Sequence, residues 1–373
     1  MSNNWKRKWN PLKRELPYKQ EPYSKKNWGN PNHSLCSYQG KLKPAIAHFL
    51  VRTFVPQKGR LLDPFCGVGT IPYEGALNKR TVFGIDISEM AYYISNAKVG
   101  FANESESNIY IEQLEEYINQ NIIEDEIKKY SDFGFNKTLK EYYEPTTFKE
   151  ILLAKRFFAI NRPTNASEMV VISSLLHILH GNRPYALSRK SHPITPYAPS
   201  GEFIYKNLVE KLRDKVDKFY KQKQVKVEGK IFLGDSTQTW SEDISDLDAI
   251  ITSPPFYDST KFYLANWIRL WFCGWEPEDF NKKPNAFVDE IQKKDFAIYE
   301  NIFRQGRERL KNDGVFVLHL GKSKKCNMGE TLERIGRRFF NHSDIFNENV
   351  EDCNTFGITD LGSVTEHQYL VLW

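Results

Sequence analysis

The chain has 373 residues, of which 40% are hydrophobic, and its mean hydropathy is negative. This composition is typical of a soluble globular protein with a sizeable core. The sequence has no apolar run of about 18 residues or more, which argues against a membrane-spanning helix. Its N-terminus is basic but lacks the apolar stretch of a secretion signal.

Charge and cysteine content narrow the class further. The net charge is +5, and basic side chains gather in the first 30 residues and again from Lys206 to Lys230. Such runs are either solvated faces or contacts to phosphate groups. The five cysteines are widely spaced without a CxxC pair, which predicts free thiols in a reducing cytoplasm and no cysteine zinc site.

In chain order, residues 1–30 show no periodic pattern and predict a basic N-terminal arm. The segment that begins at Pro44 has apolar residues at helical spacing. A strand with a glycine turn, a helix and a second strand follow, in the stretches RLLDPFCGVGT, IPYEGALNKR and TVFGIDIS. This order opens a doubly wound α/β sheet.

The middle of the chain differs in pattern. Residues 104–228 are mostly helical and contain a long irregular loop, GNRPYALSRKSHPITPYAPSGEF. Strand patterns return in KIFLGDS, DLDAIITSPPF, GVFVLHLGK and HQYLVLW. We therefore expect one catalytic α/β domain, formed by residues 31–103 and 229–373, with a mostly helical insertion at 104–228.

The glycine turn is the first candidate site. Asp63 ends a strand, Gly67 and Gly69 lie in the turn before a helix, and Asp86 ends the next strand. Glycine lets the backbone turn tightly or approach a ligand, and an acid in the place of Asp86 commonly holds a ribose diol. A turn without a ligand is the alternative. The third glycine of GxGxxG and the GxxxxGK[ST] pattern are both missing, which favours a nucleoside ligand without a pyrophosphate.

The second candidate site is Ser253-Pro254-Pro255-Phe256, directly after an apolar strand. Two consecutive prolines fix the backbone and remove two donors, but their carbonyls remain as acceptors. The Ser253 hydroxyl and the Pro254 carbonyl could accept hydrogen bonds from an amino group on a flat ring that stacks on Phe256. A rigid turn without a ligand is again the alternative.

These two motifs resemble those of the amino-methylating DNA methyltransferases, whose fourth motif is [DNS]PP[YFW]. DPFCGVGT resembles the first motif of that family, and HSLCSYQGKLKPAIAHFL resembles the helical segment that completes its cofactor pocket. SPPFYDSTKFYLANWIRLWFCGW is similar to a prokaryotic subgroup of site-specific N4-cytosine enzymes. The resemblance covers most of residues 30–373, although only the two short motifs are specific, and the first motif precedes the fourth.

The resemblance implies a Rossmann-like fold that binds S-adenosylmethionine and flips its target base out of double-stranded DNA. Asp63 would hold the methionine amino group, Asp86 the ribose hydroxyls, and Asp235 would face the adenine end. The neighbouring motif residues complete the predicted cofactor site: Pro64, Phe65, Cys66, Gly67, Gly69, Thr70, Ile87 and Ser236. The predicted catalytic residues are Ser253, Pro254, Pro255 and Phe256.

Ser253 favours cytosine N4 as the target, because Asp or Asn at that position usually accompanies adenine. A 5-methylcytosine enzyme would need a nucleophilic cysteine, usually in a Pro-Cys pair, and that pair is missing from the sequence. Cys66 is therefore better interpreted as a pocket-wall residue.

Target recognition is expected in the long loop, where basic side chains alternate with Tyr185 and Tyr197. The candidates for DNA contact are Arg183, Arg189, Lys190 and His192. A structural lid over the sheet is the alternative. His177 and His180 share one helix face, but without a third ligand nearby we expect no metal site.

Several other functions compete with this interpretation. N6-adenine methylation of DNA and guanine-N2 methylation of tRNA are the nearest, and a protein glutamine methyltransferase or a DNA-binding module without activity are more distant. Guanine-N2 enzymes usually carry DPPY or NPPY and a separate N-terminal RNA-binding domain. The recognition sequence, the oligomeric state and a cognate restriction endonuclease stay open.

Overall fold

A computed structural model of the chain describes residues 4–25, 27–38, 40–181, 183–190, 198–222, 225–257, 261–349 and 364–373. The strands are β1 (Arg60–Asp63), β2 (Thr81–Asp86), β3 (Gly229–Leu233), β4 (Leu247–Thr252), β5 (Leu310–Ser323), β6 (Ser343–Asn349) and β7 (Val364–Leu372). The first helices are α1 (Asn4–Glu15), α2 (Pro44–Phe54), α3 (Thr70–Leu77), α4 (Glu89–Val99), α5 (Glu104–Gln120), α6 (Asp125–Tyr130), α7 (Leu139–Tyr142) and α8 (Pro145–Ile160). The later helices are α9 (Ala166–Ile178), α10 (Leu208–Tyr220), α11 (Phe262–Ala265), α12 (Trp267–Phe272), α13 (Asp279–Lys282), α14 (Val288–Ile291), α15 (Ile298–Arg309) and α16 (Met328–Gly336). Short 3-10 turns are η1 (Pro17–Lys19), η2 (Pro31–Ser34) and η3 (Lys283–Ala286).

The strands form one seven-stranded sheet in the order β3-β2-β1-β4-β5-β7-β6. Strands β1 to β5 pair in parallel, whereas β7 runs antiparallel to both β5 and β6. The strand order reverses between β1 and β4, and ligands of doubly wound sheets bind beyond the carboxyl ends of the strands at such a point. This is the Rossmann-like, doubly wound sheet that the sequence predicted.

Alternating side chains of the strands enter two different cores. Leu61 packs with α2 on one face of the sheet, while Leu62 packs with α15 on the other. Both faces are covered, which explains why the central strands are apolar along their whole length rather than in alternation. The helix that begins at Pro44 and the strands expected at both candidate sites are confirmed, whereas β6 was not predicted.

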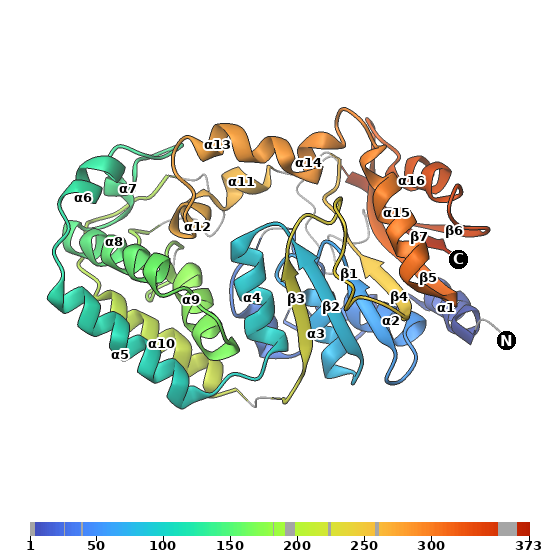
Figure 1. Cartoon of the computed structure of the whole chain (residues 1–373), viewed down its shortest axis with the longest axis horizontal. Coiled ribbons are helices and arrows are strands. Elements are labelled where there is room, and N and C mark those ends of the chain that lie inside the picture. Colours follow the sequence, from blue (N-terminus) through green and yellow to red (C-terminus); the bar gives the residue numbers. More distant parts are fainter. Residues whose placement is uncertain are drawn as a thin grey trace.

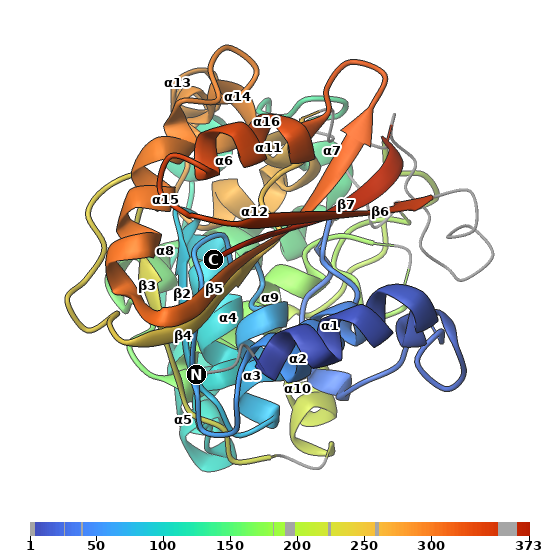
Figure 2. The same ribbon diagram turned by 90° about the vertical axis from the view of Figure 1, so that its right-hand side faces the viewer.

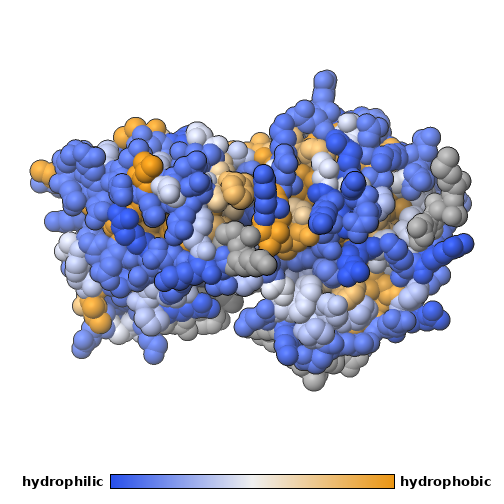
Figure 3. Space-filling model, turned by 90° about the horizontal axis from the view of Figure 1, so that it is seen from below, coloured by the Kyte–Doolittle hydropathy of each residue, from blue (hydrophilic) through white to orange (hydrophobic). Residues whose placement is uncertain are grey.

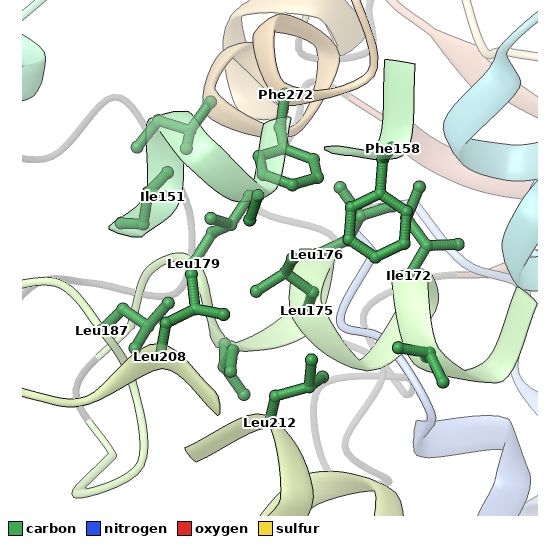
Figure 4. Close-up of a cluster of buried hydrophobic side chains, with 14 of the residues drawn as sticks. Ile151, Phe158, Ile172, Leu175, Leu176, Leu179, Leu187, Leu208, Leu212 and Phe272 are labelled. Carbon is green, nitrogen blue, oxygen red and sulfur yellow. The ribbon is translucent and has the colours of Figure 1, made fainter. Parts of the chain in front are cut away.

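A helical half lies beside the sheet, on the left of Figure 1, and is built mainly of α5 to α10. It packs on α4 through α9. Figure 4 shows its core, where side chains from α8, α9 and α10 meet Phe272 of α12. The segment 262–282 thus contributes to this helical core although it follows the SPPF motif, which the sequence pattern did not indicate.

The N-terminal segment corrects the expectation of an arm without regular structure. Residues 4–15 form α1, whose Trp5, Trp9 and Leu12 are buried at helical spacing. The Trp9 indole donates a hydrogen bond of 2.7 Å to Asp344 of β6, and α1 lies against the edge of the sheet that faces the viewer in Figure 2. Basic residues between the tryptophans hide this apolar stripe in the sequence.

The face of the molecule drawn in Figure 3 is mostly polar. Figure 3 shows hydrophilic residues over most of one face, with an apolar area between the helical half and the sheet half. Across the described ranges, none of the helices has the length and apolar character needed to cross a bilayer.

Candidate active site

The two sequence motifs meet where the strand order reverses. Asp63 ends β1 and Thr252 ends the neighbouring strand β4, so that their side chains lie together beyond the sheet. The Thr252 hydroxyl donates a hydrogen bond of 2.6 Å to Asp63 Oδ1, and both side chains are buried. The first residue of the glycine motif is therefore tied directly to the strand that carries SPPF.

The glycine loop has the backbone geometry that its sequence predicts. Gly67 and Gly69 adopt positive φ angles of 51° and 70°, which favour glycine. The Gly67 amide donates to Asp86 Oδ2 at 2.9 Å, and its carbonyl accepts from Ser95 at 2.7 Å. A Cβ on Gly69 would lie 2.9 Å from Ser95 Oγ, so this turn admits no larger residue without displacement.

The acidic strand ends carry unusual electrostatics. Burial raises the pKa of Asp63 to about 7, against the opposing effect of hydrogen bonds from Thr252 and the Phe65 amide. Burial also raises the pKa of Asp86 to about 6, although backbone amides of Ser88 and Gly67 hydrogen-bond to it. Within the described part of the chain, neither carboxylate forms an ion pair with a lysine or arginine. A buried and a half-buried carboxylate without a cation suit a ligand that brings a positive charge and hydroxyl donors.

The other predicted cofactor residues surround this loop. Thr70 Oγ1 is buried at the first residue of α3 and has no hydrogen-bond partner among the described residues. Burial, with Asp86 and Asp63 nearby, raises the pKa of the Cys66 thiol well above its usual value, so the thiol stays protonated. This agrees with a pocket-wall residue rather than a nucleophile.

The end of β3 extends the same rim. The Ser236 hydroxyl donates to the Pro64 carbonyl, which joins the β3 turn to the glycine loop. Asp235 caps its own turn by accepting from the Thr237 amide at 2.9 Å. Ile87, just beyond β2, keeps 41% of its surface exposed and offers an apolar face at this rim.

Tyr38 is a site residue that was not singled out from the sequence, although it lies in the segment HSLCSYQGKLKP. A Cβ on Gly67 would lie 3.5 Å from the Tyr38 hydroxyl. Burial and the nearby Asp86 raise the pKa of Tyr38 well above its usual value, so it remains a neutral phenol beside the glycine loop. The preceding Ser37 is held by Arg269 of α12, whose guanidinium donates to its hydroxyl at 2.6 Å.

The SPPF turn is held at both ends. Ser253 Oγ lies 3.1 Å from His319 Nδ1 of β5, and the Pro255 carbonyl accepts from Gln292 at 2.9 Å. Phe256 packs against Gly321, where a Cβ would lie 2.6 Å from the ring. Pro254 is buried, while the other three residues are half-buried.

The candidate recognition loop is only partly described. Arg183 and Lys190 are exposed, and Arg183 donates to the Tyr185 hydroxyl at 2.7 Å. Arg189 is half-buried and donates to the Gly201 carbonyl at 2.9 Å, so part of its donor capacity holds the loop itself. His192 and Tyr197 lie outside the described residues. Contact with DNA here stays a prediction.

Histidines 177 and 180 fit a structural role in this part of the fold. His177 accepts from the Ser37 amide at 3.1 Å through Nδ1, and its Nε2 lies 3.2 Å from the Tyr185 hydroxyl. Burial lowers the pKa of His177 well below its usual value, so it is neutral. In the described ranges, no group of three or more potential ligands could hold a metal ion.

The comparison with protein families agrees with this geometry. Residues 31–137 match the family model described as RMKL-like, methyltransferase domain. The match includes Tyr38, the glycine loop and both acidic strand ends, and it stops before the SPPF turn. No curated protein matches the sequence.

Solved structures match this chain only at low identity and low TM-score. A TehB-like SAM-dependent methyltransferase from Corynebacterium glutamicum is 9% identical with a TM-score of 0.32, covering 87% of this chain and 85% of that one. TrmN from Thermus thermophilus is 11% identical with a TM-score of 0.32, covering 92% of this chain and 51% of that one. The rRNA methyltransferase aviRa from Streptomyces viridochromogenes is 12% identical with a TM-score of 0.29, covering 78% and 79%. Similarities this low do not identify a substrate.

The sheet, the glycine loop and the family match lead to one class of enzyme. The protein is a methyltransferase, and its cofactor is S-adenosylmethionine. The SPPF turn and its surroundings lie outside the matched segment.

Proposed function

We propose that the protein methylates the exocyclic amino group of a base flipped out of double-stranded DNA, with cytosine N4 as the target. The observation that supports this most is the position of the SPPF turn. It follows β4 directly, and Thr252 joins it to the buried carboxylate of Asp63. An acceptor group at the turn would therefore lie next to the cofactor site.

Each residue of the cofactor site would bind a different part of S-adenosylmethionine. Asp63 would hold the methionine ammonium, Asp86 and Asp235 would hold the ribose and adenine ends, and Ile87 would contact the adenine ring. Tyr38 would close the pocket over Gly67. When bound, S-adenosylmethionine supplies an electrophilic methyl group on a sulfonium sulfur.

The SPPF turn would make the exocyclic amine of the base a better nucleophile. The lone pair of an aromatic amine is delocalised into the ring, and two acceptors for its N–H groups favour the tetrahedral geometry needed for attack. Ser253 Oγ and the Pro254 carbonyl would be these acceptors, and Phe256 would stack on the base. With the amine held in this geometry, its nitrogen would accept the methyl group that bound S-adenosylmethionine supplies and would lose one proton to solvent. Orientation of this kind supplies much of the rate in such sites.

The exposed loop residues Arg183 and Lys190 support a nucleic acid as the substrate, because cations of this kind contact phosphates and base edges. The choice of DNA depends on the SPPF turn and on the resemblance of the following segment to site-specific DNA enzymes. Ser253 in the first position favours cytosine over adenine. A cognate restriction endonuclease would fit a site-specific enzyme of this type.

One experiment tests substrate and target atom together. The full-length protein is incubated with methyl-labelled S-adenosylmethionine and, in parallel, unmethylated plasmid DNA, bulk tRNA and rRNA, and the products are digested to nucleosides for mass spectrometry. We expect label in DNA as N4-methylcytosine. The matched control is Ser253→Ala, which should lose turnover while cofactor binding by calorimetry stays unchanged. Label as N6-methyladenine would overturn the base assignment, and label only in RNA would overturn the choice of DNA.

A further inference from the structure

Strand β5 supplies two residues that contact the SPPF turn, and neither belongs to a recognised motif. His319 Nδ1 lies 3.1 Å from Ser253 Oγ. Gly321, two residues further on, abuts Phe256, with which a Cβ would collide at 2.6 Å. Residues two apart in a strand point to the same face, so β5 holds the first and last residues of the turn from one side.

His319 is a neutral side chain with a single N–H. It is 4% exposed, and burial, with His367 nearby, lowers its pKa well below the usual value. The question is therefore which ring nitrogen carries the proton, because that decides whether His319 donates to Ser253 or accepts from it.

A proton on Nε2 would leave Nδ1 to accept the Ser253 hydroxyl, which lies 3.1 Å away. The rings of His367, Tyr369 and Phe256 have centroids 4.9, 5.1 and 5.5 Å from that of His319. Nε2 has no hydrogen-bond partner among the described residues. An N–H directed at the face of one of these rings would be weakly attracted, whereas a nitrogen lone pair in that place would be repelled. With the proton on Nε2, Nδ1 is an acceptor.

We propose that His319 is a positioning residue, which accepts the Ser253 hydroxyl proton and so turns the oxygen lone pairs of Ser253 toward the methyl acceptor. A serine hydroxyl that rotates freely could donate to the substrate nitrogen and occupy the lone pair that must attack. His319 removes that orientation without touching the substrate. This inference depends on the proposed function, because it assigns Ser253 to an amino group.

The first measurement needs neither cofactor nor substrate. Imidazole nitrogen NMR of the cofactor-free protein, with the His319 signals assigned by their loss in His319→Asn, reports which nitrogen is protonated. We expect an unprotonated, hydrogen-bonded Nδ1 and a protonated Nε2. A protonated Nδ1 would overturn the proposal whatever the substrate proves to be.

The second measurement is a double-mutant cycle with Ser253→Ala on the substrate found by methyl transfer. His319→Phe should lower kcat about tenfold or more, with cofactor affinity and KM for the nucleic acid within about twofold of wild type. His319→Asn, which can place an oxygen near the position of Nδ1, should recover part of kcat and also serves if the Phe variant does not fold.

The cycle separates failure of this inference from failure of the proposed function. In the Ser253→Ala background, either His319 substitution should have no further effect on kcat, because its only role is exerted through Ser253. Independent, additive losses would overturn the positioning role while leaving the amine site intact. A Ser253→Ala variant with full activity would instead overturn the proposed use of the SPPF turn.

Discussion

The cofactor side and the substrate side of this active site are built in different ways. On the cofactor side, the loop and its acidic partners lie within residues 63–95, and the Gly67 amide finds Asp86 only 19 residues away. On the substrate side, Ser253 meets His319 66 residues later, and Pro255 meets Gln292 37 residues later. The glycine loop and its acidic partners form one short stretch of sequence, which Tyr38 and the turn at Asp235 and Ser236 join from elsewhere in the chain. The substrate side depends throughout on how β5 and the helices before it pack.

Because of this difference, we expect the substrate side, and not the cofactor side, to determine which methyl acceptor is used. A local loop keeps its geometry through its own backbone, so one cofactor site can serve many acceptors. The conformation of a turn that is held by distant residues changes when those residues are substituted, even if the SPPF sequence itself is unchanged. Substitutions on the cofactor side should therefore alter affinity for S-adenosylmethionine, whereas substitutions around SPPF should alter turnover.

The largest effect is expected at Asp63. Asp63→Asn keeps the shape of the side chain but loses its charge, so affinity for S-adenosylmethionine should fall roughly 10- to 100-fold in calorimetry. The free energy of unfolding of the cofactor-free variant should instead be higher than that of wild type at neutral and alkaline pH. The folded pKa of about 7 lies above the ordinary 3.8, so stability is full below about pH 4 and is lost as the pH rises through about 7.

The size of that loss is on the order of 4 kcal/mol for a shift of about three pKa units. Cofactor-free Asp63→Asn should thus resist urea better than wild type near pH 8 and similarly near pH 4. Asp313→Asn, at an exposed position, is the control and should change neither property. Equal urea midpoints for wild type and Asp63→Asn near pH 8 would contradict the buried, unpaired carboxylate.

Much of the cofactor side could be predicted from the sequence, and the substrate side only in part. The glycine loop and both acidic strand ends follow from short-range patterns. His319 stands out only as a single polar residue in the apolar run VFVLHLG, which does not reveal its partner. Tyr38 lies in a segment without a regular pattern, so its approach to Gly67 depends on tertiary packing.

The same limit explains the errors in the fold. Trp5, Trp9 and Leu12 are spaced for a helix, yet the basic residues between them suggested an arm. The aromatic segment after SPPF joins the helical core because Trp267, Trp271 and Phe272 pack against apolar side chains there. The local sequence pattern does not indicate which side chains these are.

A second prediction tests whether the conformation of the glycine loop is needed for cofactor binding. Gly69→Ala places a Cβ 2.9 Å from Ser95 Oγ at a φ of 70°, which should cost about 1–3 kcal/mol of stability and weaken cofactor binding. Gly274 also has a positive φ, of 103°, but no atom lies within 4 Å of the position of its Cβ. Gly274→Ala should lower the melting temperature without changing cofactor affinity. If both variants bound cofactor like wild type, the loop would not be the binding element.

The smallest effect is expected at Thr252, where the two sides join. Its hydroxyl lowers the pKa of Asp63 by hydrogen bonding, so Thr252→Val should raise that pKa further above about 7. Near pH 7 a smaller fraction of Asp63 is then ionised, and the dissociation constant for S-adenosylmethionine should rise about threefold relative to wild type. Near pH 9 the carboxylate is mostly ionised in both proteins, so the ratio of their dissociation constants should approach one.

Thr252→Ser keeps the hydroxyl and is the matched control, with wild-type affinity at both pH values. Using the ratio to wild type at each pH cancels any titration of the ligand itself. A ratio that stayed the same from pH 7 to pH 9 would mean that Thr252 acts through packing alone. A ratio that falls with pH would mean that the last residue of β4 sets the charge at the end of β1, so that the substrate strand tunes the cofactor site across a single hydrogen bond.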